Sequence, residues 1–259
     1  MASPEIVYHY TSFGVLNSIL KNNSVWLTGK HHLNDPDEGD IIFKLLDKYE
    51  SDEGVELDKF REDINSYDFF VNCMTTHGDK LSQWRGYGDQ GKGVSIGFDF
   101  DRIKRHISGS KEILLKKVEY IKKSTPIIPA GVLRSFSEAK KRCGSPSSAS
   151  DEYLHTIKKD QCSLKYDSYA EEDEYRLIYT TKEYKDKIIV GGREIGDKKY
   201  IEINGAIREY YELKIEKEII KKIYIGPKSK NQDMFVMKRF LDSMGFSHVD
   251  VEISDLNFR

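Results

Sequence analysis

The sequence predicts an α+β fold, a single domain with a mixed, mostly antiparallel twisted sheet flanked by helices. Short β-prone segments outnumber helical segments and do not alternate strictly with them, which disfavours a doubly wound parallel sheet. The 259 residues include 16 Tyr, 12 Phe and 2 Trp, which supply large side chains for a core. No linker divides the chain, so we expect residues 1–259 to form one domain.

The first elements are short and well marked. Ile6–Tyr10 is β-prone and aromatic, which predicts a strand. Ser12 stands where a helix N-cap belongs, and the apolar residues after it keep helical spacing up to a stop at Asn22 and Asn23. Ser24–Thr28 then predicts a second short strand.

A strong helix start follows the second strand. Asp35 can cap the helix, Pro36 suits its first position, and Glu38 stands where a capping box places its acid. We expect this helix to include the apolar residues 41–46, and a second, polar helix to follow at residues 57–64.

The rest of the chain predicts more strands than helices. Two central strands, 68–75 and 93–100, enclose a polar, Gly-rich segment, 77–92, that we expect to be a loop. Another strand is expected at 114–121, and the Ser-rich stretch 143–150 is expected to be a flexible loop between two helices. Those helices are expected at 136–142 and 151–165, further strands at 175–181, 199–203, 206–214 and 219–225, a helix at 231–244 and a last strand at 248–253.

Composition and missing motifs exclude several classes of protein. The 41 Lys and Arg nearly balance the 43 Asp and Glu, which disfavours a protein that binds nucleic acid or membranes through its net charge. The sequence shows no apolar run of membrane-spanning length and no secretory signal. Three cysteines without a C-x-x-C pair form neither a disulfide framework nor a zinc ribbon. We expect a cytoplasmic protein with no membrane partner.

The motifs of several common enzyme classes are also missing. The chain has no Walker A loop, no G-x-G-x-x-G, no H-E-x-x-H and no G-x-S-x-G. This disfavours a kinase, a zinc hydrolase and a serine hydrolase, and we expect no metal.

The first polar segment that could bind a ligand is the opening strand. His9 and Thr11 stand two residues apart, so they can point to the same side of a strand and hydrogen-bond a ligand there. A histidine at the end of a strand is more often structural, and that alternative stays open.

Asn34 is the candidate in the second segment. The capping box accounts for Asp35, Pro36 and Glu38 without any ligand, and it leaves Asn34 unexplained. A calcium loop is disfavoured because the D-x-D-x-D-G spacing is missing.

The third segment places polar and aromatic residues together between two predicted strands. Its candidates are Gln83, Trp84, Arg85 and Tyr87. An arginine can clamp a phosphate through two hydrogen bonds, and the aromatic rings can stack on a base. Alternatively, Trp84 anchors the loop to the core while Arg85 pairs with an internal acid.

The fourth segment is an acidic run before a strand. Glu172 and Glu174 share a parity with Arg176, so all three lie on one face if the strand starts early. Paired carboxylates can have separated pKa values and serve as catalytic groups, although acidic runs are usually solvated.

With these residues identified, the chain resembles the domain-of-unknown-function family 2971, found mostly in bacteria and phages. The resemblance runs nearly end to end. Its motifs, in order, are YHYTS with an L-x-x-IL helix, WLT, LNDPDE, LSQWRGYGD-x-GKGVSIGFD, EE-x-EYR, EIIKKIYIGP and V-x-IS-x-L-x-FR. The position before Arg176 is often Trp in that family and is Tyr175 here.

The opening YHYT strand and the helix after it also resemble, more distantly, the ADP-ribosyltransferase superfamily and its toxin branch. That resemblance implies an ADP-ribosyltransferase-like fold and NAD as a substrate. It also implies that His9 and Thr11 hold a ribose of NAD, and that Glu174, paired with Glu172, is catalytic. We then expect Arg85 to meet the pyrophosphate, one of Tyr10, Trp84 and Tyr87 to stack on nicotinamide, and Glu174→Gln to abolish nicotinamide release without unfolding the protein.

Two other functions remain open. A metal-dependent nuclease or phosphoester hydrolase would use Asp35, Glu38 and Asp40, or Glu172 and Glu174, to hold magnesium. A non-enzymatic module would bind a nucleotide or a protein through the loop that contains Trp84 and Arg85. In the transferase hypothesis the acceptor stays open between a protein, a small molecule, a nucleic acid and water, and the biological role would be that of a toxin or defence effector.

Overall fold

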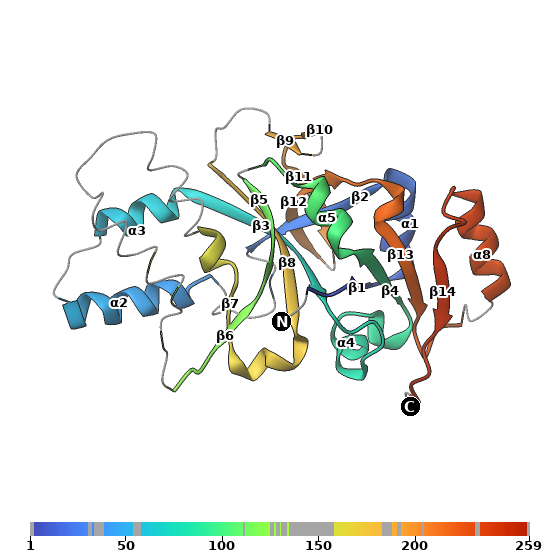
Figure 1. Ribbon diagram of the computed structural model, residues 1–259, viewed down its shortest axis with the longest axis horizontal. Coiled ribbons are helices and arrows are strands. Elements are labelled where there is room, and N and C mark those ends of the chain that lie inside the picture. The colour runs from blue at the N-terminus through green and yellow to red at the C-terminus, as the bar shows by residue number, and fades with distance from the viewer. Residues whose placement is uncertain are drawn as a thin grey trace.

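The structure is a computed structural model. It describes residues 3–30, 33, 39–53, 58–110, 112–124, 127, 130, 134, 158–182, 188–190, 193–203, 205–230 and 234–257. A long twisted sheet crosses the molecule, with α2 and α3 beyond one end and α8 beside the other (Figure 1). The α+β class is therefore confirmed, and the sheet is mixed and mostly antiparallel, because only β13 and β14 of its strands pair in parallel.

The described elements have the following bounds. The ten strands of the large sheet are β1 (Ile6–Thr11), β2 (Ser24–Gly29), β3 (Tyr67–Thr75), β4 (Val94–Asp99), β5 (Ile113–Lys117), β8 (Glu174–Lys182), β11 (Lys199–Ile203), β12 (Ala206–Lys214), β13 (Ile220–Ile225) and β14 (Asp250–Ile253). Two short pairs are β6 (Glu119–Ile121) with β7 (Leu164–Tyr166) and β9 (Ile188–Val190) with β10 (Arg193–Ile195). The helices are α1 (Phe13–Asn22), α2 (Ile41–Glu53), α3 (Asp58–Asn65), α4 (Leu81–Gly86), α5 (Phe100–His106) and α8 (Met234–Ser243).

The sheet branches at β3. Along one edge, β3 pairs with β8 over its whole length. Along the other edge, the first half of β3 pairs with β2, up to Val71 opposite Thr28, and its end pairs with β1, at Thr75 opposite Tyr8. Two arms, β2–β12–β11 and β1–β4–β13–β14, therefore diverge from one strand and leave a fork beside residues 72–74.

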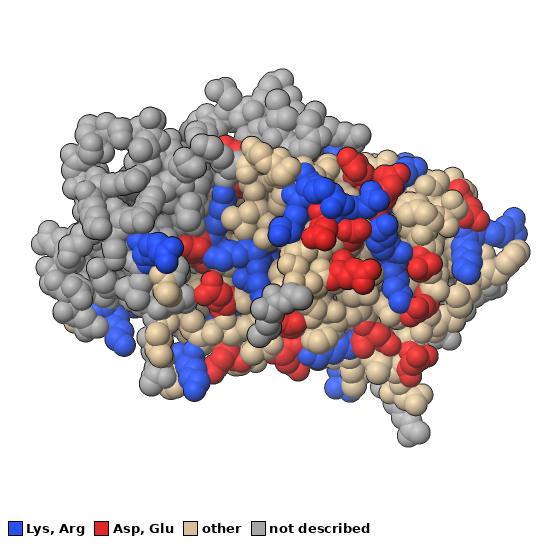
Figure 2. Space-filling view, in the orientation of Figure 1, with Lys and Arg blue, Asp and Glu red and all other residues tan. Residues whose placement is uncertain are grey.

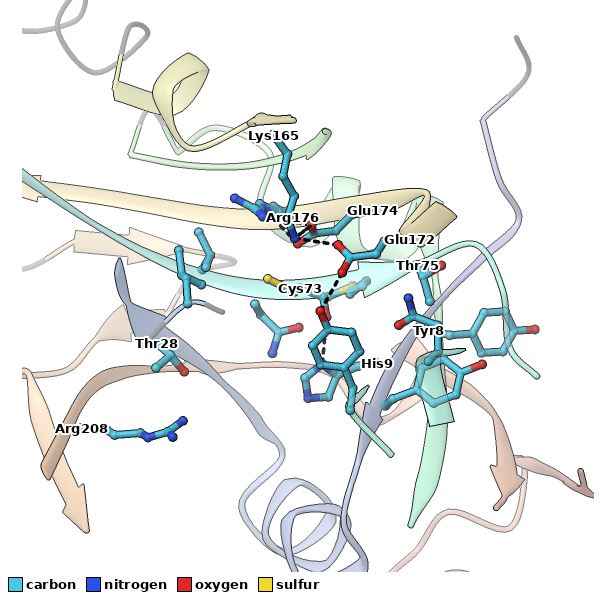
Figure 3. A pocket seen from close by; sticks show the side chains of 17 residues that line it. Tyr8, His9, Thr28, Cys73, Thr75, Lys165, Glu172, Glu174, Arg176 and Arg208 are labelled. Carbon is cyan, nitrogen blue, oxygen red and sulfur yellow. Dashed lines mark hydrogen bonds and ion pairs between the residues drawn. The ribbon is translucent and has the colours of Figure 1, made fainter. Parts of the chain in front are cut away.

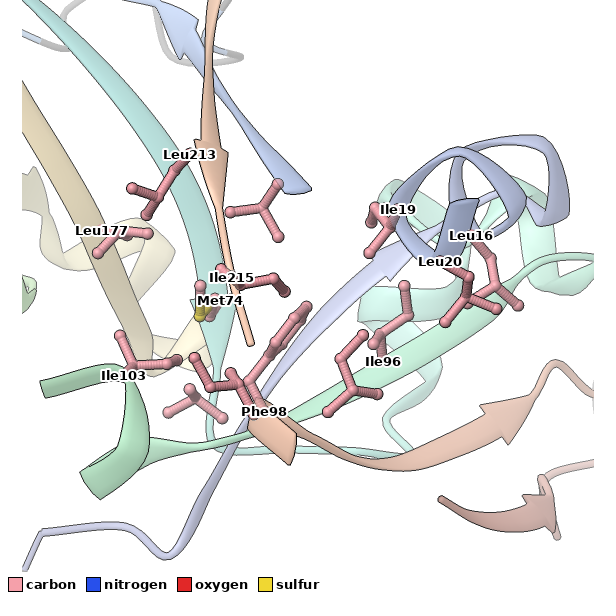
Figure 4. Close-up of a cluster of buried hydrophobic side chains, with 14 of the residues drawn as sticks. Leu16, Ile19, Leu20, Met74, Ile96, Phe98, Ile103, Leu177, Leu213 and Ile215 are labelled. Carbon is pink, nitrogen blue, oxygen red and sulfur yellow. The ribbon is translucent and has the colours of Figure 1, made fainter. Parts of the chain in front are cut away.

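Helix α1 forms as its sequence predicts. The Ser12 side chain accepts a hydrogen bond from the Val15 amide at 3.3 Å, and Asn23 ends the helix in the left-handed conformation. Its apolar face is buried near Ile96 of β4 (Figure 4).

The main core lies on one face of the branched sheet. Phe98, Ile103, Leu177, Leu213 and Ile215, which come from four elements and the segment after β12, belong to one buried cluster (Figure 4). Because side chains alternate along each strand, Phe69 and Val71 of β3 and Ile178 of β8 point to the opposite face, where they form a second, smaller buried cluster. Glu174 and Arg176 lie on that same face of β8. That face carries the candidate site.

Several predicted elements need correction. The expected loop 77–92 contains helix α4 and a 3₁₀ turn at Asp89–Gly91, because Gln83 and Trp84 bury one face of a segment that is polar elsewhere. The single strand expected at 114–121 breaks at Val118 into β5 and β6. Part of the predicted helix 151–165 is strand β7, with helical structure described only at residues 158–161.

Predictions for residues 34–38, 136–142 and 143–150 lie outside the described residues. The predicted N-cap of the second helix therefore remains a prediction, while α2 itself begins at Ile41 and buries Ile41, Ile42 and Leu45.

After α4, the backbone at Gly93 lies very close to the end of β1. A Cβ atom on Gly93 would lie 2.1 Å from the Thr11 carbonyl oxygen, so only glycine fits there. This close approach fixes the position of α4 relative to the end of β1.

The surface mixes both signs of charge. On the face shown in Figure 2, Lys and Arg side chains are interspersed with Asp and Glu side chains. Among the described helices, none is both long enough and apolar enough to cross a membrane.

Candidate functional site

A cavity of about 260 Å³ opens at the fork in the sheet. Five strands, β1, β2, β3, β8 and β12, form its walls (Figure 3). Leu33 and the segments around α4 and β7 complete the lining. The cavity exists because β1 and β2 diverge from β3, which leaves no strand to fill the space between them.

His9 stands at this fork. Its Nδ1 lies 2.8 Å from the Cys73 carbonyl oxygen, so Nδ1 carries the proton and donates it. This hydrogen bond gives the Cys73 carbonyl a partner at the fork, between the part of β3 that pairs with β2 and the part that pairs with β1. Burial lowers the pKa of His9, against a smaller opposing effect of the bond to Cys73. The ring is therefore neutral near pH 7, and Nε2 remains a hydrogen-bond acceptor.

Burial of His9 makes stability depend on pH. Its folded pKa lies below the unfolded value of 6.5, so the unfolded chain binds more protons as the pH falls past that value. The free energy of unfolding should therefore decrease from about pH 7.5 to 5.5, and less so in His9→Gln, measured by urea denaturation. An unchanged pH dependence in His9→Gln would contradict this assignment.

Glu174 is held by two cations. It is 4% exposed, and its Oε1 accepts from Arg176 Nε at 2.7 Å while Oε2 accepts from Arg176 Nη2 at 2.9 Å. Lys165 Nζ lies 3.3 Å from Oε2. Burial raises the pKa of Glu174, and the Lys165 ammonium opposes that shift. Glu174 therefore orients Arg176 and Lys165 and is closed to solvent.

Glu172 lies at the mouth of the same cluster. Its Oε2 accepts from Lys165 Nζ at 2.6 Å and its Oε1 accepts from the Tyr87 hydroxyl at 2.7 Å (Figure 3). Burial lowers the pKa of Lys165, but the two carboxylates raise it by more, so its ammonium stays charged. Glu172 has 12% of its side chain exposed, more than the 5% of Glu174, and it faces the cavity.

The turn before β8 explains how both acids reach one place. Asp173 adopts the left-handed conformation, with φ of 43°, and its carboxylate binds Lys117 at 2.8 Å. The Glu174 amide donates to the Tyr120 hydroxyl at 2.9 Å. Strand parity thus places Glu174 beside Arg176 as predicted, whereas Glu172 reaches the cavity from a 3₁₀ turn that precedes the strand.

Tyr10 and Trp84 hold α4 against β1. The Tyr10 hydroxyl donates to the His77 carbonyl at 2.8 Å and accepts from the Lys80 amide at 2.9 Å. Trp84 packs edge-on against Tyr10, with ring centroids 4.7 Å apart, and its Nε1 donates to Asp79 at 2.6 Å. Trp84 is fully buried, so it anchors the segment to the core, one of the two roles that the sequence left open.

The cavity brings together six of the predicted site residues. They are His9, Tyr10, Gln83, Tyr87, Glu172 and Glu174. Thr11 is buried next to the Gly93 approach and does not line the cavity, and neither does Trp84. Arg85 is exposed and lies outside the cavity lining, and Asn34 lies outside the described residues.

The sequence did not single out Lys165 or Arg208 as site residues. Lys165 falls in a segment that the sequence predicted as helical, although it lies in β7. Arg208 lies in a strand of alternating polar residues, where a cation on a sheet face has no distinguishing neighbours in sequence. Only the pairing of distant strands brings either residue to the fork.

A metal site is not apparent in the part of the chain that the structure describes. There, no group of three or more His, Cys, Asp and Glu side chains is arranged to hold an ion. Glu172 and Glu174 share the Lys165 ammonium, which occupies the position between them. Asp35 and Glu38 lie outside the described residues, and Asp40 does not line the cavity.

Comparison with known proteins shows similarity to the DUF2971 family over only part of the chain. The family described as "Protein of unknown function (DUF2971)" matches residues 83–177. This range contains most of the LSQWRGYGD-x-GKGVSIGFD motif and the EE-x-EYR motif, and the end-to-end resemblance is corrected to it. Neither the curated proteins nor the solved structures gave a significant match. The chain is thus similar to DUF2971 proteins over the segment that supplies Gln83, Tyr87, Glu172 and Glu174.

Proposed function

We propose that this chain is an ADP-ribosyltransferase-like enzyme that uses NAD and transfers ADP-ribose to an acceptor or to water. One observation supports this above all. His9, from the first strand, lines the same cavity as Glu174 at the start of β8 and Glu172 in the 3₁₀ turn before it. A neutral imidazole acceptor and a carboxylate are the two groups that the proposed NAD chemistry requires.

In this proposal the two acids have different roles. Breaking the bond between nicotinamide and ribose sends the bonding electron pair to nicotinamide and leaves positive charge on the ribose. The Glu172 carboxylate stabilises that charge and accepts the proton of the attacking nucleophile. Nε2 of His9 accepts a hydrogen bond from a ribose hydroxyl. Glu174 is a positioning residue, because its oxygens already bind Arg176 and Lys165.

A direct assay tests the proposal. The purified protein is incubated with NAD, and separately with magnesium and nucleic acid, and products are identified by mass. Release of nicotinamide that continues in the presence of a chelator supports the proposal, whether ADP-ribose is found free or on an acceptor. Cleavage of nucleic acid that the chelator stops, with NAD unchanged, would replace it with the hydrolase alternative.

The cavity's charge favours a second candidate, a module that binds an anionic nucleotide without turnover. Lys165, Arg176 and Arg208 face only two carboxylates among the described lining residues, and His9 is neutral. Binding of NAD with no product over a long incubation would support this candidate. For either candidate we propose a cytoplasmic location, because the spacing of the three cysteines is not that of a disulfide framework.

A further inference from the structure

Arg208 enters the cavity from the β12 arm of the fork. Tyr210 pairs with Thr28, and Arg208, two residues earlier on β12, shares that face of the sheet. Thr28 and Arg208 lie on the side of the cavity away from Lys165, Glu172 and Glu174 (Figure 3). The two ends of the cavity thus differ in chemistry.

In the described part of the chain, no carboxylate pairs with the guanidinium group of Arg208. Its Nε is buried and has no hydrogen-bond partner in the described part of the chain, where no ion pair involves this residue either. Arginine stays protonated at all ordinary pH values, so Arg208 brings to the cavity a positive charge that no acid of the described residues pairs with. A buried donor without a partner is unfavourable, which an incoming anion would correct.

A second unsatisfied group lies at the fork. Asn72 Nδ2 donates to the Trp26 carbonyl at 3.0 Å, which fixes the orientation of the amide. Its Oδ1 is buried and has no partner among the described groups. Asn72 also lines the cavity, so its oxygen can accept a hydrogen bond from a ligand hydroxyl.

We infer that Arg208 binds a phosphate group of the ligand, while Asn72 accepts a hydrogen bond from a hydroxyl of the sugar that carries it. The ligand class is a phosphorylated nucleoside. This inference rests on the proposed function, in which the phosphate belongs to the pyrophosphate of NAD. It gives Arg208 the role that the sequence suggested for Arg85, which lies outside the cavity lining. Planar guanidinium groups suit phosphate because they donate two parallel hydrogen bonds.

The test compares ligands that differ by one phosphate. Nicotinamide mononucleotide and nicotinamide riboside are titrated by calorimetry into the wild type, Arg208→Gln and Arg208→Lys. We expect Arg208→Gln to weaken mononucleotide binding by about 10- to 100-fold and to leave riboside binding unchanged. Arg208→Lys should restore part of the loss. Arg85→Gln is the matched control, and it should bind both ligands as the wild type does. Thermal unfolding verifies that each variant is folded.

The other outcomes separate this inference from the proposed function. If Arg208→Gln weakens the affinity for both ligands equally, or for neither, Arg208 does not bind the phosphate, and the proposed NAD chemistry is unaffected. If the wild type binds neither nicotinamide ligand, ADP and inorganic pyrophosphate are titrated in their place. If ADP or pyrophosphate binds and Arg208→Gln weakens that binding, the phosphate site stands and NAD is rejected as the ligand. If neither compound binds, the inference is wrong.

Discussion

Replacing Glu172 with glutamine is expected to reduce the rate of nicotinamide release from NAD by about 100- to 1,000-fold. Glutamine keeps the size of the side chain and can still hydrogen-bond Tyr87, but it has no negative charge to stabilise the ribose in the transition state. The change should appear in kcat, because the ground state carries little of that charge. Nicotinamide is quantified by chromatography at saturating NAD.

Glu171→Gln is the matched control for this experiment. Glu171 is exposed and adjacent in sequence, and its side chain does not line the cavity. It should keep the wild-type kcat. If Glu172→Gln turned over NAD at the wild-type rate while remaining folded, Glu172 would have no catalytic role and the mechanism proposed above would fail.

Replacing Glu174 with glutamine is expected to lower the free energy of unfolding by about 3–5 kcal/mol. The change removes the carboxylate that accepts two hydrogen bonds from Arg176, a residue that is 1% exposed, while the bond from Arg176 to the Cys162 carbonyl remains. A buried charge without its partner is strongly unfavourable. Urea denaturation monitored by tryptophan fluorescence measures the loss.

An exposed ion pair and a double variant serve as controls. Lys199→Gln breaks the pair of Lys199 and Glu212, in which the lysine side chain is 46% exposed, and should cost less than about 1 kcal/mol. Glu174→Gln combined with Arg176→Met should lose less unfolding free energy than the sum of the two single changes, because the guanidinium group that loses its carboxylate in Glu174→Gln is no longer present. If Glu174→Gln lowered the free energy of unfolding as little as Lys199→Gln does, the pair of Glu174 and Arg176 would not be important for stability.

This expected instability changes how the catalytic test is designed. From sequence, Glu174→Gln is expected to stop nicotinamide release and leave the fold intact. Because Glu174 contacts Arg176 and Lys165, the Glu174→Gln variant is expected to be less stable. A loss of activity in this variant would therefore not separate a catalytic role from a loss of folded protein. Glu172, which is less buried and holds only Lys165 and Tyr87 in the described structure, is the cleaner position for the test.

Local features of the sequence predicted most elements. Ser12 and Asn23 bound α1 through capping interactions that involve near neighbours only. Alternation along β8 correctly placed Glu174 and Arg176 on one face. Helix α4 was missed because its burial depends on Tyr10, which is far away in sequence, and not on its own composition.

The site was predicted only in part, for a related reason. His9, Glu172 and Glu174 were recognised as unusual residues, and they do line one cavity. Arg208 and Lys165 were not recognised, because an isolated cation in a polar strand carries no local signal. Arg85 was selected by its neighbours in sequence, yet its side chain lies outside the cavity lining.

Capping, periodicity and strand alternation are short-range effects, and so the residues alone were enough to predict α1, most strands and the pairing of Glu174 with Arg176. The fork at β3 is different. It arises because one edge of a single strand is shared by β1 and β2, whose own partners, β4 and β12, lie far apart in the chain. Long-range pairing of this kind is set by the packing of the whole sheet. That packing opened the cavity and brought Arg208, His9 and the two glutamates to its walls.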